Sequence, residues 1–339
     1  MPQAIILPAD ASGGGLSLAT YTDRLADELG YRLITTVATE AASGEAQRVV
    51  LADELRDDEA GADLLGEPWL YVRTGDQFNT QNRVMTAPGI GYQGANSAVM
   101  LARPFAAPLE VGDTIVVTSP LPIKRFGLVK GLHDCVNEAL ALVWIKARLT
   151  FTGNGTDSYS LAAYPFVQSY QQTRGIYELQ PHDPTLAPVL SPYRYEIVHN
   201  GIERTLVTRR PYVYNSAETF YLDIAVRADR LVYDGASWIY VAANGTPGLQ
   251  NETYLAAAPE EWVVAEGMCK ALQFLTRYVM QNRRLSQDEK DALLADILPR
   301  RRTWAITALR IKHALYPQPL PERRETLVAG VSGWPVSLA

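Results

Sequence analysis

The sequence is poor in the residues that most often build reactive sites. Its 339 residues include only two cysteines, Cys135 and Cys269, and four histidines. Both cysteines fall on apolar faces of predicted helices, so we interpret them as reduced core residues and not as a disulfide. No two histidines stand three or four positions apart, the spacing at which one helix face presents a zinc pair. These absences argue against a disulfide-stapled domain and against a zinc site.

The sequence also lacks an excess of positive charge and any long apolar run. Its formal net charge is -6 at pH 7, which argues against a nucleic-acid-binding surface built on a broad basic face. No run approaches the roughly 18 apolar residues of a membrane-spanning helix. The opening residues, MPQAIILPAD, lack the basic segment and the apolar length of a secretory signal. We therefore expect synthesis in the cytoplasm and no membrane partner.

Catalytic motifs are equally scarce. Residues 89–94 match the spacing G-x-G-x-x-G, but Pro88 precedes them and a strand-like segment follows. A dinucleotide site needs a strand before these glycines and a helix after them, so we interpret the motif as a loop. No G-x-S-x-G elbow is present, and neither cysteine stands in a setting that would activate it. We expect no enzyme activity, no metal and no cofactor, with an enzyme of unrecognised type kept as an alternative.

Three separated stretches have the period of an amphipathic helix with one apolar stripe, and they span residues 18–29, 128–147 and 259–315. Gly30 is well placed to cap the first helix. Within the third stretch, Ser286 and Glu289 form a capping box that predicts the start of a second helix. Pro299 predicts an interruption of that helix. Because each apolar stripe must be covered, we expect the helices to pack on one another.

Two stretches between these helices have the patterning of strands. Residues 33–118 hold short strand candidates joined by Gly, Pro, Asn and Asp, which predicts a small antiparallel sheet or barrel. In residues 148–256 the pairs Asn-Gly and Asp-Gly recur, and these pairs favour tight hairpins. The clearest hairpin runs from Tyr193 to Thr208 and is predicted to turn at Asn200-Gly201. Turns about every ten residues predict a β-sandwich.

Together these patterns predict an α+β fold. Its centre is a helical bundle built from sequence-distant helices, with two inserted antiparallel β regions, a small sheet or barrel and a β-sandwich, and an extended C-terminal arm. The predicted parts are an N-terminal arm and first helix (1–30), a first β region (31–120), a long central helix (121–148), a β-sandwich-like region (149–257), C-terminal helices (258–316) and the arm (317–339).

Three segments carry a resemblance to a known family. Gly112-Asp113-Thr114-Ile115 precedes a proline-containing turn and a helix with Asn137-Glu138-Ala139-Leu140. The segment YTDRLADELG from Tyr21 to Gly30 forms a short opening helix, and Ala258-Pro259-Glu260-Glu261-Trp262 begins a long one. In this order the segments resemble the head-to-tail adaptor (connector) proteins of tailed bacteriophages.

The resemblance implies a structural virion protein. Such a subunit forms a homo-oligomeric ring, twelve-fold to match a portal, in the neck of the virion, and it is made in the host cytoplasm. Its partners would be the portal protein and tail or neck proteins, and double-stranded DNA would pass through the lumen without sequence-specific binding. A net negative chain suits that role, because an acidic lumen repels phosphates. The alternative from another class is a carbohydrate- or receptor-binding β module of a phage tail.

Two groups of residues are candidates for an interface. Arg300, Arg301 and Arg302 form the main basic concentration, with Arg283-Arg284 nearby in the sequence. They are either a solvated helix junction or a contact with an acidic neighbouring subunit or with DNA. The second group lies in the proline-rich C-terminal arm, where Leu327, Val331 and Trp334 are too apolar for a purely solvated tail. We expect the arm to dock on another subunit or partner, with the tryptophan as an anchor.

Overall fold

The fold is mixed α+β, with four α-helices and several small antiparallel sheets in the part of the chain that the structure describes. None of the described sheets closes on itself by strand pairing, and the predicted barrel and β-sandwich are not confirmed. The computed structural model describes residues 5–6, 16–31, 33–39, 48–52, 69–77, 80–85, 92–93, 98–118, 128–162, 164, 167, 173–178, 188–190, 194–200, 203–208, 213–216, 218–233, 238–240 and 254–315.

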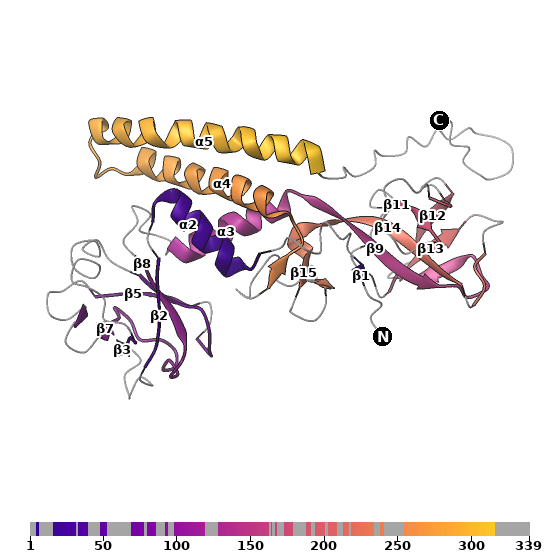
Figure 1. Ribbon diagram of the computed structural model, residues 1–339, viewed down its shortest axis with the longest axis horizontal. Coiled ribbons are helices and arrows are strands. Elements are labelled where there is room, and N and C mark those ends of the chain that lie inside the picture. Colours follow the sequence, from indigo (N-terminus) through magenta and orange to yellow (C-terminus); the bar gives the residue numbers. More distant parts are fainter. Residues whose placement is uncertain are drawn as a thin grey trace.

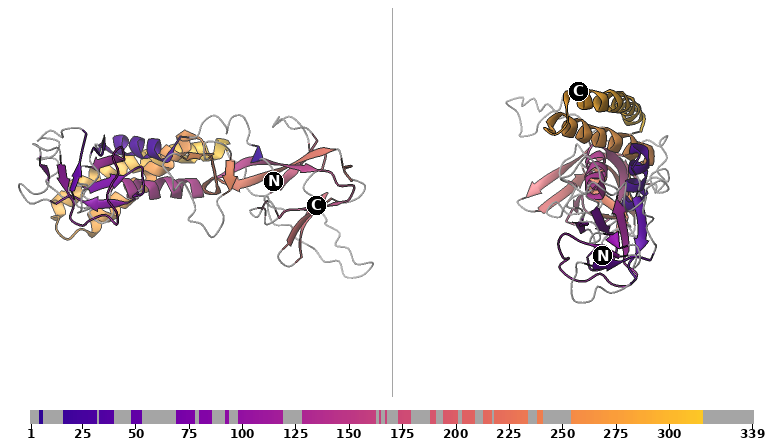
Figure 2. Two further views of the ribbon diagram at one scale, coloured as in Figure 1. Left: turned by 90° about the horizontal axis from the view of Figure 1, so that it is seen from below. Right: turned by 90° about the vertical axis from the view of Figure 1, so that its left-hand side faces the viewer.

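The four helices lie in layers along one side of an elongated molecule (Figure 1). They are α2 (Leu18–Leu29), α3 (Leu128–Ala141), α4 (Glu260–Gln281) and α5 (Gln287–Leu315). Helix α4 contacts α2 and α3 on one side and α5 on the other, so α5 is the outermost layer (Figure 2). Helices that are far apart in the sequence therefore pack together, as the single apolar stripes predict.

Helix α2 begins and ends where its local sequence predicts. Ser17 is the N-cap residue, and its hydroxyl accepts a hydrogen bond from the Thr20 backbone N–H. Gly30 adopts a left-handed conformation with φ of 82°, and its N–H donates to the Asp27 carbonyl. Glycine tolerates this conformation without the steric cost that a Cβ would add, so the predicted cap is confirmed.

The predicted helix over residues 128–147 is wrong in its last six residues. Helix α3 ends at Ala141, and strand β9 (Trp144–Thr152) begins three residues later. In this strand the buried apolar side chains Ile145, Ala147, Leu149 and Phe151 recur at every second position, which is the period of a strand and not of a helix. Pairing with all nine residues of β14 (Thr219–Arg227) then fixes this segment as a strand.

The predicted interruption at Pro299 is also wrong, because α5 is one helix of 29 residues that contains this proline. Proline inside a helix removes one backbone hydrogen bond and costs about 3 kcal/mol. The turns on both sides, however, bury Ile297 and Ala308 in the main core. Helix α5 begins at the predicted capping box, where the Ser286 N–H donates to the Glu289 carboxylate at 2.8 Å and the Glu289 N–H donates to the Ser286 hydroxyl at 3.3 Å.

The first β region consists of two antiparallel sheets. One has the order β2-β8-β4-β5 and the other β3-β7-β6. Single bridges, Ala38 to Leu51 and Val84 to Leu101, join the ends of the two sheets, and their inward side chains form one core. The strands are β2 (Leu33–Val37), β3 (Arg48–Val50), β4 (Trp69–Val72), β5 (Gln81–Arg83), β6 (Tyr92–Gln93), β7 (Ala98–Met100) and β8 (Thr114–Thr118).

The second β region is built on the long β9–β14 pair. One sheet has the order β1-β9-β14-β11, a second β10-β13-β12 and a third β16-β15-β17. The predicted hairpin is present as β12 and β13, with Asn200 opposite Glu203. The remaining elements are β1 (Ile5–Ile6), β10 (Ser158–Ser160), β11 (Thr173–Tyr177), β12 (Tyr195–Asn200), β13 (Glu203–Thr208), the 3-10 turn η4 (Ala228–Arg230), β15 (Leu231–Tyr233), β16 (Trp238–Tyr240) and β17 (Leu255–Ala256).

The interior of the described part of the molecule consists of two large hydrophobic cores and a small cluster of Tyr71, Val116 and Val129. The larger core runs from the helices into the second β region, and the smaller one fills the first β region. In the larger core, Trp262 of α4 is fully buried and its indole N–H donates to the Ala139 carbonyl of α3 at 3.1 Å. Gly267 of α4 faces Leu25 of α2 so closely that an added Cβ would lie 3.1 Å from the leucine side chain. The two β regions lie toward opposite ends of the long axis (Figures 1 and 2).

Candidate interaction surface on helix α5

The three consecutive arginines do not form one patch, because successive residues of a helix point about 100° apart. Arg300 turns toward α2, where its guanidinium donates to the backbone carbonyl of Glu28. Arg301 is half-buried, and its positive charge influences the Cys269 thiol of α4 electrostatically. Burial raises the pKa of this thiol to about 11, and the arginine charge opposes the rise. Only Arg302 is exposed on the outer side of the helix.

Arg300 therefore has a structural function within the chain. Glu28 belongs to the last turn of α2, where backbone carbonyls lack helical partners and carry the negative end of the helix dipole. A guanidinium at this position satisfies one such carbonyl and ties α5 to α2. Of the predicted basic cluster, Arg302 is the residue that remains available to another molecule. The predicted arm residues Leu327, Val331 and Trp334 lie outside the described residues.

The other basic pair does not extend this cluster. Arg283 and Arg284 are exposed in the connection between α4 and α5. Helix α5 begins at Gln287, and at a rise of 1.5 Å per residue Arg302 lies roughly 22 Å further along the helix. The basic residues that the sequence groups together are thus distributed over separate places.

The outer side of α5 carries apolar residues instead, and we call Leu298, Ile306 and Leu309 the outer stripe of α5. These side chains are 46%, 45% and 57% exposed. Their spacing of eight and three residues places them on one side of the helix, with the exposed Arg302 between them. A helix that packs on α4 through one side is therefore also apolar on the side that faces away from the core.

Sequence reasoning missed the outer stripe because it assigned one apolar face to each helix. Trp304, Ala308 and Ile311 belong to the inner face, and they are buried or half-buried against the main core. The signal was present in the spacing of Leu298, Ile306 and Leu309, which fall opposite that face on a helical wheel. A test for two stripes instead of one would have found it.

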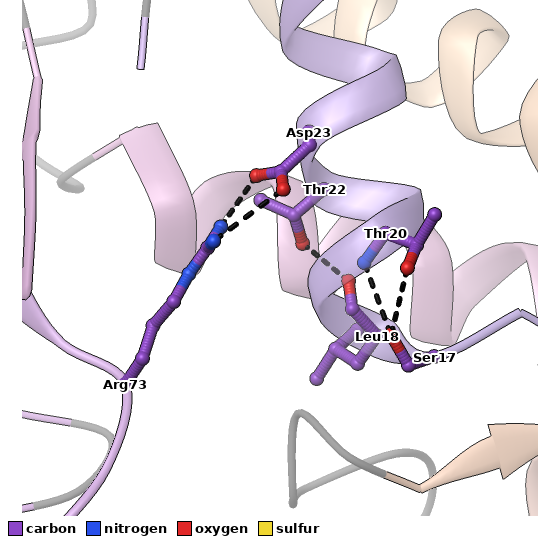
Figure 3. Close-up of polar contacts among 6 residues, drawn as sticks. All are labelled: Ser17, Leu18, Thr20, Thr22, Asp23 and Arg73. Atoms are coloured by element: carbon purple, nitrogen blue, oxygen red, sulfur yellow. Dashed lines mark hydrogen bonds and ion pairs between the residues drawn. The ribbon is translucent and has the colours of Figure 1, made fainter. Parts of the chain in front are cut away.

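A polar contact connects the first β region to the helices (Figure 3). Arg73 follows strand β4 and forms an ion pair with Asp23 of α2, with 2.5 Å between Nη2 and Oδ1. The arginine side chain is only 9% exposed, whereas the aspartate is 44% exposed. Close by, the ring of His133 on α3 meets Tyr71 of β4 edge-on, with 5.4 Å between the ring centroids. The first β region is therefore anchored to two helices and does not depend on its linkers alone.

A second set of charges lies between α3 and α4. The Lys270 ammonium is 3.6 Å from the Glu138 carboxylate and 3.9 Å from that of Glu266. Burial raises the pKa of Glu266, and the charges of Lys270 and Lys312 oppose this rise. Only the pair with Glu138 joins α4 to α3, and a partly exposed ion pair of this kind contributes about 1 kcal/mol or less. Both cysteine thiols of the chain lie near these charges, and burial raises the pKa of both, which disfavours the nucleophilic thiolate.

The described residues show neither a metal site nor a membrane-spanning helix. They contain no group of three or more His, Cys, Asp or Glu side chains that could hold a metal ion. None of the helices in that part of the chain has the length and apolarity to cross a membrane. In comparisons with known proteins, no family model, no curated protein and no solved structure matches the chain.

Proposed function

We propose that the chain is a structural subunit of the head-to-tail connector in a tailed bacteriophage. It would assemble as a ring between portal and tail, with packaged DNA passing through the lumen. The observation that carries this proposal is the elongated arrangement, in which the two β regions lie toward opposite ends of the long axis and the layered helices run along one side of the molecule (Figure 1). An adaptor needs two separate ends for two partners and a middle that packs side by side around a ring.

The segments that resemble the adaptor family support the proposal by their positions. The family-like residues 112–115 lead into β8, residues 137–140 lie in α3, and residues 258–262 lead into α4. Residues 137–140 and 258–262 lie in or beside α3 and α4, which contact each other, and residues 112–115 lie in the first β region. A shared core of this kind is what a family resemblance without an active site would preserve.

The finer architecture is part of the same proposal. We infer that α2, α3, α4 and α5 act as one helical bundle, and that the second β region is a sandwich inserted between its helices. Supporting this, Val136 of α3 and Leu272 of α4 are both fully buried in the core that also contains the β9–β14 pair. Val136→Asp and Leu272→Asp should each lower the free energy of unfolding by several kcal/mol, since each buries an unpaired charge. Wild-type thermal stability of both variants would contradict the bundle.

The alternative of a carbohydrate-binding β module finds little support in the described residues. Such a module presents aromatic rings on an exposed surface, because sugars stack on them. Here Phe151, Tyr159, Tyr164 and Phe220 pack against one another inside the core of the second β region. None of the exposed large apolar residues in the described part of the chain is aromatic.

The ring is tested by mass photometry and negative-stain microscopy, with the chain alone and mixed with purified portal rings. Twelve copies of the 37.4 kDa chain would weigh about 450 kDa. A ring of this mass, alone or on the portal, is the expected result. A chain that stays a monomer in both samples would contradict the proposal. Binding to glycans in the same preparation would favour the carbohydrate-binding alternative.

A further inference from the structure

The outer stripe of α5 is an apolar surface that the described helices and strands leave exposed. Leu298, Ile306 and Leu309 are exposed on α5, the outermost helix layer (Figure 2). They occupy the central and C-terminal turns of a helix that ends at Leu315. Isolated exposed leucines are ordinary on a protein surface, but three on one side of a helix indicate a binding surface.

The chain itself continues beyond this helix with a segment of matching chemistry. Residues 316–326 combine three prolines with charged residues, and residues 327–336 read LVAGVSGWPV. The second part contains no charged side chain and includes Trp334. Burial of these apolar side chains would be favourable, but they do not recur with the period of a helix or a strand, so the segment cannot form a core by itself. The molecule thus has an apolar surface and an apolar segment that begins 12 residues after the end of α5.

The distances allow these two features of one chain to meet. From Leu315 back to Leu298 the helix measures roughly 26 Å, at 1.5 Å per residue. An extended spacer of the length of residues 316–326 reaches about 36 Å, at 3.3 Å per residue. Residue 327 can therefore be placed beside any turn between Leu298 and Leu315. A tether of this length holds the segment at an effective concentration in the millimolar range, far above that of a second copy in dilute solution.

We propose that in the free subunit residues 327–336 bind back onto the outer stripe of α5 of the same chain. Trp334 is the anchor, because an aromatic side chain supplies the largest buried area at an interface. Arg302, exposed within the stripe, provides a guanidinium that can stack on the indole ring. This contact keeps the stripe covered before assembly, and it does not depend on the connector function proposed above.

A photo-cross-linking experiment tests the contact. Trp334 is replaced by benzoylphenylalanine in the full-length chain, and the purified protein is illuminated at micromolar concentration. Peptide mapping by mass spectrometry should find that position 334 is cross-linked to a residue within the range 298–309 of α5. An equal mixture of chains with natural nitrogen and with nitrogen-15 distinguishes the sources, because a contact within one chain joins only peptides of the same isotope.

Two matched variants make the result specific. The triple variant Leu298→Ser/Ile306→Ser/Leu309→Ser removes the stripe and should lower the α5 cross-link at least tenfold. Met280→Ser/Leu293→Ser changes two exposed apolar residues outside the stripe, which are 63% and 40% exposed, and should leave the yield unchanged. All five positions are exposed, so circular dichroism should show folded proteins. Cross-links that join mixed isotopes, map to another part of the chain, fail to form, or survive the triple variant would each overturn the proposal.

Discussion

The sharpest test of how the second β region is built is to remove one charge from its interior. Arg148 of β9 and Asp223 of β14 are directly opposite each other in the sheet, and both are fully buried. The guanidinium donates to both carboxylate oxygens, with 2.9 Å between Nη2 and Oδ2. It also lies over the Tyr177 ring, 4.5 Å from the ring centroid. The substitution to be tested is Asp223→Asn, which keeps the side-chain volume and removes the negative charge.

The expected cost follows from burial. Removing one partner of a buried ion pair costs about 3–5 kcal/mol, because the remaining charge stays away from water. The amide oxygen that Asp223→Asn introduces could still accept one hydrogen bond from Arg148, so we expect a loss of about 3 kcal/mol in the free energy of unfolding. Lys146 is 3.2 Å from Asp223 but its side chain is 31% exposed. Lys146→Met should therefore cost about 1 kcal/mol or less.

The double variant Arg148→Met/Asp223→Leu separates desolvation from packing. Replacing both members of a buried pair by apolar residues of similar volume is often neutral or stabilising. The free energy of unfolding of this variant should therefore be within about 1 kcal/mol of the wild-type value and higher than that of Asp223→Asn. The assay is urea unfolding followed by near-ultraviolet circular dichroism, which reports the tyrosines of this region. A cost below about 1 kcal/mol for Asp223→Asn, or a double variant less stable than the single one, would refute the reasoning.

Two further predictions rest on perturbed pKa values. Hydrogen bonds from Ser286 lower the pKa of the Glu289 carboxyl. The capping box therefore stabilises α5 fully above the ordinary glutamate pKa, and this contribution is lost as the pH falls through the lowered pKa. An NMR titration of Glu289 should find the lowered pKa, and Ser286→Ala should return it toward the ordinary value near 4.3. Burial raises the pKa of Cys135 to about 12 and that of Cys269 to about 11, so at pH 8 both should react with a maleimide roughly 100-fold or more slowly than free cysteine; rates equal to that of free cysteine would show that the thiols are not buried.

The parts of the fold that the sequence predicts correctly are those with a local signal. Helix α2 is bounded by Ser17 and Gly30, whose caps are formed by residues within a few positions. The Ser286 and Glu289 side chains mark the start of α5 in the same way. The β12–β13 hairpin needs only a turn pair between two alternating runs. In each case the partners are close in the chain, so one short stretch of sequence contains both.

The errors arise where distant partners decide the structure. The local pattern alone predicts a helix for residues 144–147, and it is their pairing with β14, about 70 residues away, that makes them a strand. Pro299 is a strong local stop signal, yet the turns on both sides of it pack into the core through Ile297 and Ala308. A local preference of about 3 kcal/mol is overcome by packing of this extent.

The same reasoning explains what could be learned of the candidate surface. A run of three arginines reads as a single basic patch, but the helix directs Arg300 to α2 and Arg301 to α4, and leaves only Arg302 outside. Which face of a helix can form an interface depends on which face remains exposed to solvent. This in turn depends on how the helix layers pack on one another. Because α5 packs mainly on α4, the outer face of α5 stays exposed with its three apolar residues. The surface therefore follows from the order of the layers, while its chemistry was already present in the sequence.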